Sequence, residues 1–222
     1  MQDLGDADEL EIESNVQLIV EGRDQVGFSE ALLRHLEITR VQIHDFGGVS
    51  QLRGFLGGFV ATDGFSRVER IGVIRDAEDS AEDAFRSVQN ALAEVGLAVP
   101  EQPEERTEGR PSVSALILPG GGRAGMLETL LCESFAETPA NGCIDRFFEC
   151  MAGVSDSSIA NPAKARVFAY LATTPSPRHS VGVAALRGQW DLDHSAFDDV
   201  RRFVEELASG ARAGGTLGAR SR

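Results

Sequence analysis

Lysine is almost absent from this sequence. Lys164 is the only lysine among 21 basic residues, and all the others are arginines. Lysine carries a compact point charge whereas arginine presents a planar fork of donors, so the two are not interchangeable. Lys164 is therefore either a residue kept for its chemistry or a chance survivor of a bias towards arginine, and composition leaves both interpretations open.

Long apolar runs and paired cysteines are also missing. No stretch of about 18 apolar residues occurs, which argues against a transmembrane helix. Residues 1–14 are acidic and lack the basic-then-apolar pattern of a signal peptide, so we expect a cytoplasmic protein. The three cysteines (132, 143 and 150) are an odd number without CxxC spacing, which favours reduced thiols.

Several catalytic signatures are absent as well. The four histidines are scattered and show no HExxH spacing, which disfavours a zinc site. No GxSxG segment occurs, which disfavours a serine hydrolase. The glycine-rich stretch 120–125 lacks the Gly-Lys-Ser/Thr end of an ATPase P-loop.

The charge balance is strongly acidic, with a formal net charge of −14. Such a surface repels nucleic acid at long range and argues against a dedicated nucleic-acid-binding module. The negative charge does not exclude an enzyme that contacts phosphates through a bound metal ion.

The 222 residues alternate between expected strands and expected helices. Apolar runs predict strands at 17–21, 41–43, 68–74 and 113–118, and apolar residues at helical spacing predict helices between them. This alternation predicts an α/β fold with a mainly parallel four-stranded sheet flanked by helices. We expect an acidic disordered tail (1–14), a sheet domain (15–138), a helical C-terminal extension packed on the same domain (139–208) and a second disordered tail (209–222).

Acidic residues stand where the expected strands end. Glu21 closes the first strand, Asp45 follows the second, Asp76 and Glu78 follow the third, and Glu128 opens the helix after the fourth. Ligands of open α/β sheets bind outside the carboxyl ends of the strands, and neighbouring strands lie about 4.8 Å apart. Clustered carboxylates repel one another unless a cation neutralises them, and Mg²⁺ prefers such oxygen ligands.

Simpler explanations exist for some of these acids. Asp45 could simply form a turn, and Glu128 could simply stabilise the N-terminus of a helix. Asp24 could equally well be a helix cap or an outer ligand of the metal. Glu21 and Asp76 are different, because each comes directly after an apolar strand, where a lone carboxylate is costly.

Two of these segments resemble the motifs of Toprim domains. Residues 18–24 (LIVEGRD) resemble the opening motif, an apolar strand ending in Glu-Gly, and residues 71–78 (IGVIRDAE) resemble the second motif, a strand ending in Asp-x-Asp. The resemblance covers about residues 16–135. It is strongest to a Toprim-like group of uncharacterised prokaryotic proteins related to OLD-type nuclease domains.

The resemblance implies roles for the matching positions. Glu21 would be a metal ligand or general acid/base, and Lys164 would lie near the scissile phosphate. The implied ligands of Mg²⁺, or of Mn²⁺ in its place, are Glu21, Asp76, Glu78 and Glu128, with Gly22, Asp24 and Asp45 as supporting positions. Glu78 and Gln25 depart from the family pattern, since both stand where aspartate is usual.

Three functions follow as hypotheses. The first is a Mg²⁺-dependent nuclease acting on DNA or RNA, with a separate ATPase partner, because OLD proteins carry an ATPase in the same chain. The second is a non-catalytic or regulatory metal-binding Toprim module that acts through a protein partner. The third is a receiver-like domain with Asp76 as phosphoacceptor.

Overall fold

The computed structural model describes residues 10–154 and 159–209. Four parallel strands form one sheet in the order β2-β1-β3-β4. The elements follow the chain as β1 (Val16–Val20), α1 (Arg23–His35), β2 (Val41–Asp45), α2 (Leu52–Ala61), η1 (Phe65–Arg67), β3 (Arg70–Asp76), α3 (Ala81–Glu94), β4 (Ser112–Leu118), α4 (Leu127–Ser134), α5 (Pro139–Ala152), α6 (Pro162–Ala172), α7 (Val181–Leu186), η2 (Ser195–Phe197) and α8 (Asp198–Ser209). The predicted parallel α/β fold is therefore confirmed.

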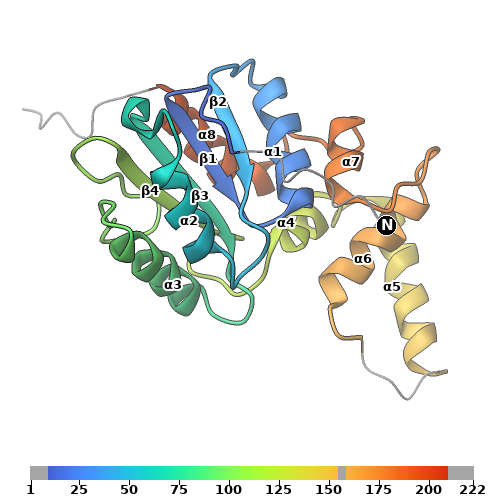
Figure 1. The fold of residues 1–222 in the computed structure, drawn as a ribbon. Coiled ribbons are helices and arrows are strands. Elements are labelled where there is room, and N and C mark those ends of the chain that lie inside the picture. Colours follow the sequence, from blue (N-terminus) through green and yellow to red (C-terminus); the bar gives the residue numbers. More distant parts are fainter. Residues whose placement is uncertain (1–9, 155–158, 210–222) are drawn as a thin grey trace, which may run out of the picture.

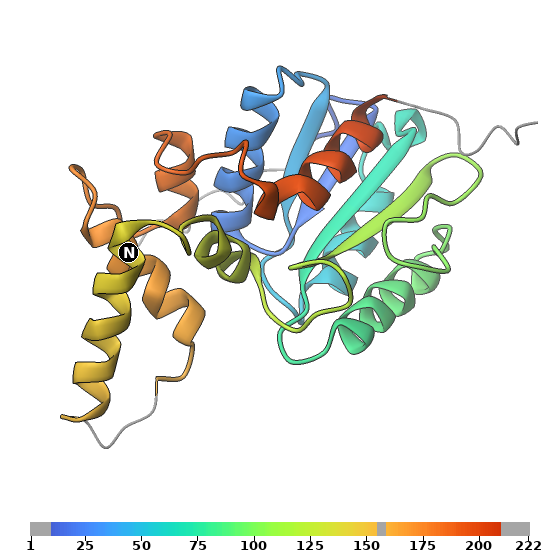
Figure 2. The same cartoon turned by 180° about the vertical axis from the view of Figure 1, so that it is seen from behind.

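The strands are short and strongly apolar because helices cover both faces of the sheet. Alternate residues of β1 point to opposite faces: Leu18 packs with α1 and α8, whereas Ile19 packs with α2 and α3. Figures 1 and 2 show this layering, with α2 and α3 on one face and α8 across the other. Close packing of α8 depends on Gly72, where an added Cβ would lie 2.6 Å from Leu207.

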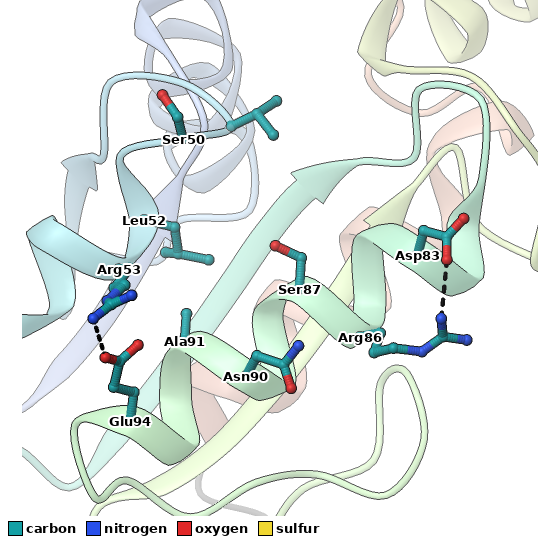
Figure 3. A pocket seen from close by; sticks show the side chains of 10 residues that line it. Ser50, Leu52, Arg53, Asp83, Arg86, Ser87, Asn90, Ala91 and Glu94 are labelled. Atoms are coloured by element: carbon teal, nitrogen blue, oxygen red, sulfur yellow. Dashed lines mark hydrogen bonds and ion pairs between the residues drawn. The ribbon is translucent and has the colours of Figure 1, made fainter.

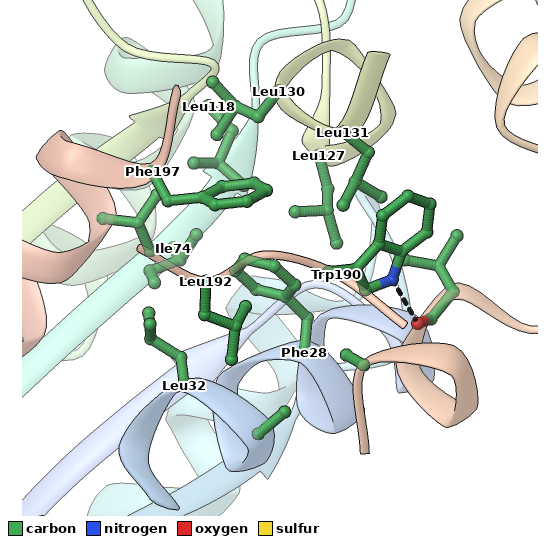
Figure 4. Packing of buried hydrophobic residues seen from close by; sticks show 14 of the residues in the cluster. Phe28, Leu32, Ile74, Leu118, Leu127, Leu130, Leu131, Trp190, Leu192 and Phe197 are labelled. Carbon is green, nitrogen blue, oxygen red and sulfur yellow. Dashed lines mark hydrogen bonds between the residues drawn. The ribbon is translucent and has the colours of Figure 1, made fainter. Parts of the chain in front are cut away.

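The larger core lies on the α1, α4 and α8 face (Figure 4). Phe28 of α1 and Phe197 of η2 meet there with ring centroids 5.3 Å apart. Trp190, the only tryptophan, is buried beside them, and its indole N–H donates to the Val181 carbonyl at 3.4 Å. Trp190 therefore anchors the C-terminal segment in this core.

The C-terminal helices divide into two groups. In both views α5 and α6 project as a hairpin to one side of the sheet, whereas α8 returns to cover it (Figures 1 and 2). α7 was not expected from the sequence, and it packs against α1. No helix in the described ranges is long and apolar enough to cross a membrane.

The segment boundaries differ from the expectation at several places. β3 begins two residues later and ends at Asp76, because its pairing with β4 continues to the pair Asp76 and Leu118. Residues 10–14 belong to the folded part, since Ile12 is buried under α2 and its neighbours. The remainder of the expected first tail (1–9) and all but residue 209 of the second (210–222) lie outside the described residues.

Candidate functional site

The candidate site lies at the point where the strand order reverses. The chain moves from β1 outward to β2 and then returns to place β3 on the other side of β1. In open α/β sheets the crevice at the carboxyl ends of two such strands is the usual ligand position. Glu21 directly follows β1, and Asp76 is the last residue of β3. The topology alone therefore places these two acids side by side.

A hydrogen bond connects them. The backbone N–H of Asp76 donates to Oε2 of Glu21 at 3.0 Å. Oδ1 of Asp76 in turn accepts the backbone N–H of Leu127, at the start of α4, at 3.0 Å. The ends of β1 and β3 and the first turn of α4 are thus joined through two carboxylates.

Glu78 is held by a backbone bridge to the loop before α4. Its N–H donates to the Gly125 carbonyl at 2.9 Å, and the N–H of Gly125 donates to the Glu78 carbonyl at 2.8 Å. Glu78 has a φ of 52°, a left-handed conformation that is uncommon for glutamate. Such a conformation persists where its surroundings impose it, and functional sites are enriched in it.

Glu128 and Lys164 complete the arrangement. Glu128 lies in the first turn of α4 and is only 7% exposed. Its Oε1 lies 3.8 Å from Nζ of Lys164, a half-exposed residue of α6. The single lysine of the chain therefore lies next to an acid that the motif analysis selected independently.

The electrostatics show that the acids lie close enough to interact. Burial raises the pKa of Asp76, the carboxylates of Glu21, Glu128 and Glu78 add to the effect, and the Leu127 hydrogen bond opposes it, so that the pKa is about 8. Burial also raises the pKa of Glu21, while the Asp76 N–H and the nearby Arg75 lower it. Crowding and partial burial thus make it costly to ionise these groups together.

The donor set suits a hard divalent cation, because carboxylate oxygens are what Mg²⁺ and Mn²⁺ prefer. Glu21, Asp76, Glu78 and Glu128 are the residues that could hold one. Within residues 10–154 and 159–209, however, no three Asp, Glu, His or Cys side chains already form a group of metal ligands. The three glutamates have long side chains, so rotation about their χ angles would have to bring their oxygens together.

The supporting positions expected from the sequence lie around this cluster with other partners. Asp24 does not cap its own helix: its Oδ1 accepts from the Ser180 hydroxyl at 2.6 Å and the Gly182 N–H at 3.0 Å, at the start of α7. Asp45 accepts the Gly47 N–H at 2.7 Å, which makes a turn. Gly22 is the N-cap of α1, and no side chain caps that helix end.

Two further residues contribute to the site, although the sequence predicted no role for either of them. Gln25 is 6% exposed, and its Oε1 accepts the N–H of Glu21 at 3.0 Å, which fixes the backbone there. Arg75 is also 6% exposed and lies close enough to Glu21 to lower its pKa. An arginine inside an apolar strand is costly to bury without a carboxylate nearby, and this signal could have revealed Arg75.

A separate hollow lies between α2 and α3, with a volume of about 390 Å³. Figure 3 shows that its arginines face acids: Arg53 pairs with Glu94, and Arg86 donates to Asp83 at 3.1 Å. No residue of the carboxylate cluster lines this hollow. We therefore base the functional argument on the cluster and not on the hollow.

Comparison with known proteins gives one family and one structural likeness. The model of a family described as "Protein of unknown function (DUF3226)" matches residues 15–209. The solved C-terminal region of the Xanthomonas campestris pv. campestris OLD protein is similar at 14% identity with a TM-score of 0.38, covering 90% of this chain and 88% of that one. This likeness is too distant to carry an argument about function. No curated protein matches the chain.

Proposed function

Because the chain belongs to DUF3226, a family of unknown function, we propose an activity from its own residues: Mg²⁺-dependent cleavage of phosphodiester bonds in nucleic acid at a Toprim-like carboxylate site. The observation that carries the proposal is the pairing of Glu21 with Asp76 at the switch point, where burial and three neighbouring acids raise the pKa of Asp76 to about 8. At neutral pH such a group is mostly protonated unless a cation lies beside it.

Each residue has a distinct part in this proposal. Asp76, Glu78 and Glu128 are the ligands, and a bound Mg²⁺ or Mn²⁺ would stabilise the negative charge that develops on the phosphate. Glu21, whose pKa is raised, accepts or donates the proton of the reaction. Lys164 has a half-exposed ammonium group beside Glu128 and binds a phosphate oxygen of the substrate.

The acidic surface suggests that the chain binds nucleic acid only weakly on its own. Its net charge of −14 repels a polyanion, and a second chain with a basic surface would strengthen binding. We propose a separate ATPase as this partner, in keeping with the resemblance to OLD-type domains. Affinity purification from the native host that recovers no ATPase would count against it.

Cleavage assays with matched variants test the activity. Plasmid DNA and RNA are incubated with Mg²⁺ or Mn²⁺ and the parent, Glu21→Gln or Asp76→Asn, with Glu82→Gln as control. Glu82 lies on the exposed face of α3 and pairs with Arg86, so its replacement makes the same change of charge outside the site. We expect each site variant to lose about 100-fold or more of the cleavage rate and the control to keep it. Undiminished cleavage by both site variants would refute the proposal.

The net charge and the two departures from the motif pattern, Gln25 and Glu78, favour a second candidate, a regulatory metal-binding module. Such a module binds a divalent cation and a protein partner without cutting. A parent that cuts neither DNA nor RNA but is stabilised by Mg²⁺ through Asp76 would select this candidate.

A further inference from the structure

The helical hairpin formed by α5 and α6 leaves an apolar seam uncovered. Ala140, Cys143, Phe147, Cys150 and Val154 follow one another at intervals of three, four, three and four residues. Phe147 is 53% exposed and Val154 is 73% exposed, and both cysteines are exposed. Within α5, which ends at Ala152, this spacing is that of the a and d positions of helices that pack along one another, and Val154 follows just beyond the helix end.

The seam is distinct from the face that α5 uses within the chain. Ile144 is buried in the core, and Phe148 packs against the same cluster. These two residues lie about 100° around the helix from Cys143 and Phe147. Ile159 and Phe168 are further exposed apolar residues of the hairpin. Exposed apolar residues that gather on one face of a helix, as Cys143, Phe147 and Cys150 do, are typical of an interaction site.

The distribution of charge along the chain indicates which partner can bind to the seam. The hairpin, residues 139–172, contains three basic and three acidic residues, so the whole net charge of −14 lies elsewhere in the chain. Two copies of this chain repel each other over most of their surface, but not where two hairpins meet. Figures 1 and 2 show α5 and α6 projecting away from the sheet, which keeps the acidic bodies apart when the α5 helices of two copies meet.

We propose that the α5–α6 hairpin is a self-association surface through which two copies of this chain pair as a four-helix bundle, with Phe147 at its centre. α5 has 14 residues and is therefore about 21 Å long, and two helices side by side are about 20 Å wide. A face of about 400 Å² from each copy buries about 800 Å² in total, which is below the range of stable interfaces and fits only a weak, transient one. The dimer is accordingly weak, with a dissociation constant on the order of 10 μM.

Sedimentation equilibrium of the full chain, with reductant and EDTA present, tests the surface separately from the carboxylate site. We expect the parent to dimerise and Phe147→Glu to raise the dissociation constant at least tenfold. Val49→Glu is the matched control, because Val49 is similarly exposed (46%) but lies before α2. Equal melting temperatures at low concentration would show that all three chains are folded. A parent that stays monomeric to about 200 μM, or a Phe147→Glu variant that dimerises like the parent, would overturn the proposal.

Thiol crosslinking locates the interface. The Cys132→Ser variant keeps only the two seam cysteines, Cys143 and Cys150. A flexible bismaleimide should crosslink this variant into dimers at concentrations where it associates, and adding Phe147→Glu should abolish the product. A dimer that forms by sedimentation but gives no crosslinked product would use another surface, and the proposal would be wrong.

Discussion

Asp76 has the most unfavourable position of any acid in the candidate site. It ends a buried strand, and burial together with three neighbouring carboxylates raises its pKa to about 8. In the folded chain without metal it therefore keeps a proton at neutral pH that the unfolded chain releases near pH 4. An acidic residue at a position where its ionisation lowers the stability of the fold is typical of a functional site.

This imbalance predicts how Asp76→Asn changes stability with pH. Because the folded pKa is raised, the parent loses stability as pH increases from about 4 to 8, whereas asparagine does not titrate. We expect the variant to be more stable than the parent at pH 8, by about 1–3 kcal/mol, and equal to it near pH 4. Urea unfolding in EDTA at both pH values measures the difference. A variant that is less stable at pH 8 would show that Asp76 is ionised without cost.

The sequence was sufficient to predict where Glu21 and Asp76 lie, because the end of a parallel strand places a residue at a known edge of the sheet. It could not predict that Asp24 bonds to Ser180 or that Gln25 fixes the Glu21 backbone. Those contacts depend on side-chain rotamers and on segments up to 156 residues apart. Lys164 reaches Glu128 only because α6 packs on α4, which no local pattern encodes.

Among the elements, α7 shows how a neighbouring helix helps to stabilise a short one. It has six residues, and Asp24 of α1 accepts hydrogen bonds from both Ser180 and Gly182 at its start. The backbones approach closely where Gly27 meets Gly182, since a Cβ on Gly27 would lie 2.7 Å from the Gly182 Cα. So short a helix is marginal in isolation, which explains why its sequence pattern did not predict it.

Two glycine substitutions should therefore have opposite effects. Gly27→Ala forces α1 and α7 apart, because the new methyl group meets backbone atoms, and should destabilise the protein by about 1–3 kcal/mol. Gly57→Ala lies inside α2 with open space around it and should stabilise the protein by about 0.5–1 kcal/mol. Urea unfolding of both variants measures these changes. If both substitutions changed the free energy of unfolding equally, α1 and α7 would tolerate being pushed apart.

At the scale of the whole molecule, the carboxylate cluster and the hairpin are separate features joined through α6. Lys164 on α6 reaches the cluster, while the seam on α5 faces away from the core. The alternation of strands and helices was enough to predict the sheet and its order of elements. It was not enough to predict that α8 returns to the sheet while α5 and α6 project, because an apolar face shows that a helix packs against something but not which surface it packs against.

The most direct test of the account is thermal unfolding of the parent, Asp76→Asn and Glu82→Gln in EDTA and in increasing Mg²⁺. A cation that binds only the folded chain stabilises it by about 2.7 kcal/mol at 100 times its dissociation constant, which for a chain of this size raises the melting temperature by roughly 5 °C or more. We predict this rise for the parent and the Glu82→Gln control, and its loss in Asp76→Asn. An equal rise in all three chains, or none in the parent, would contradict a metal site at the ends of β1 and β3.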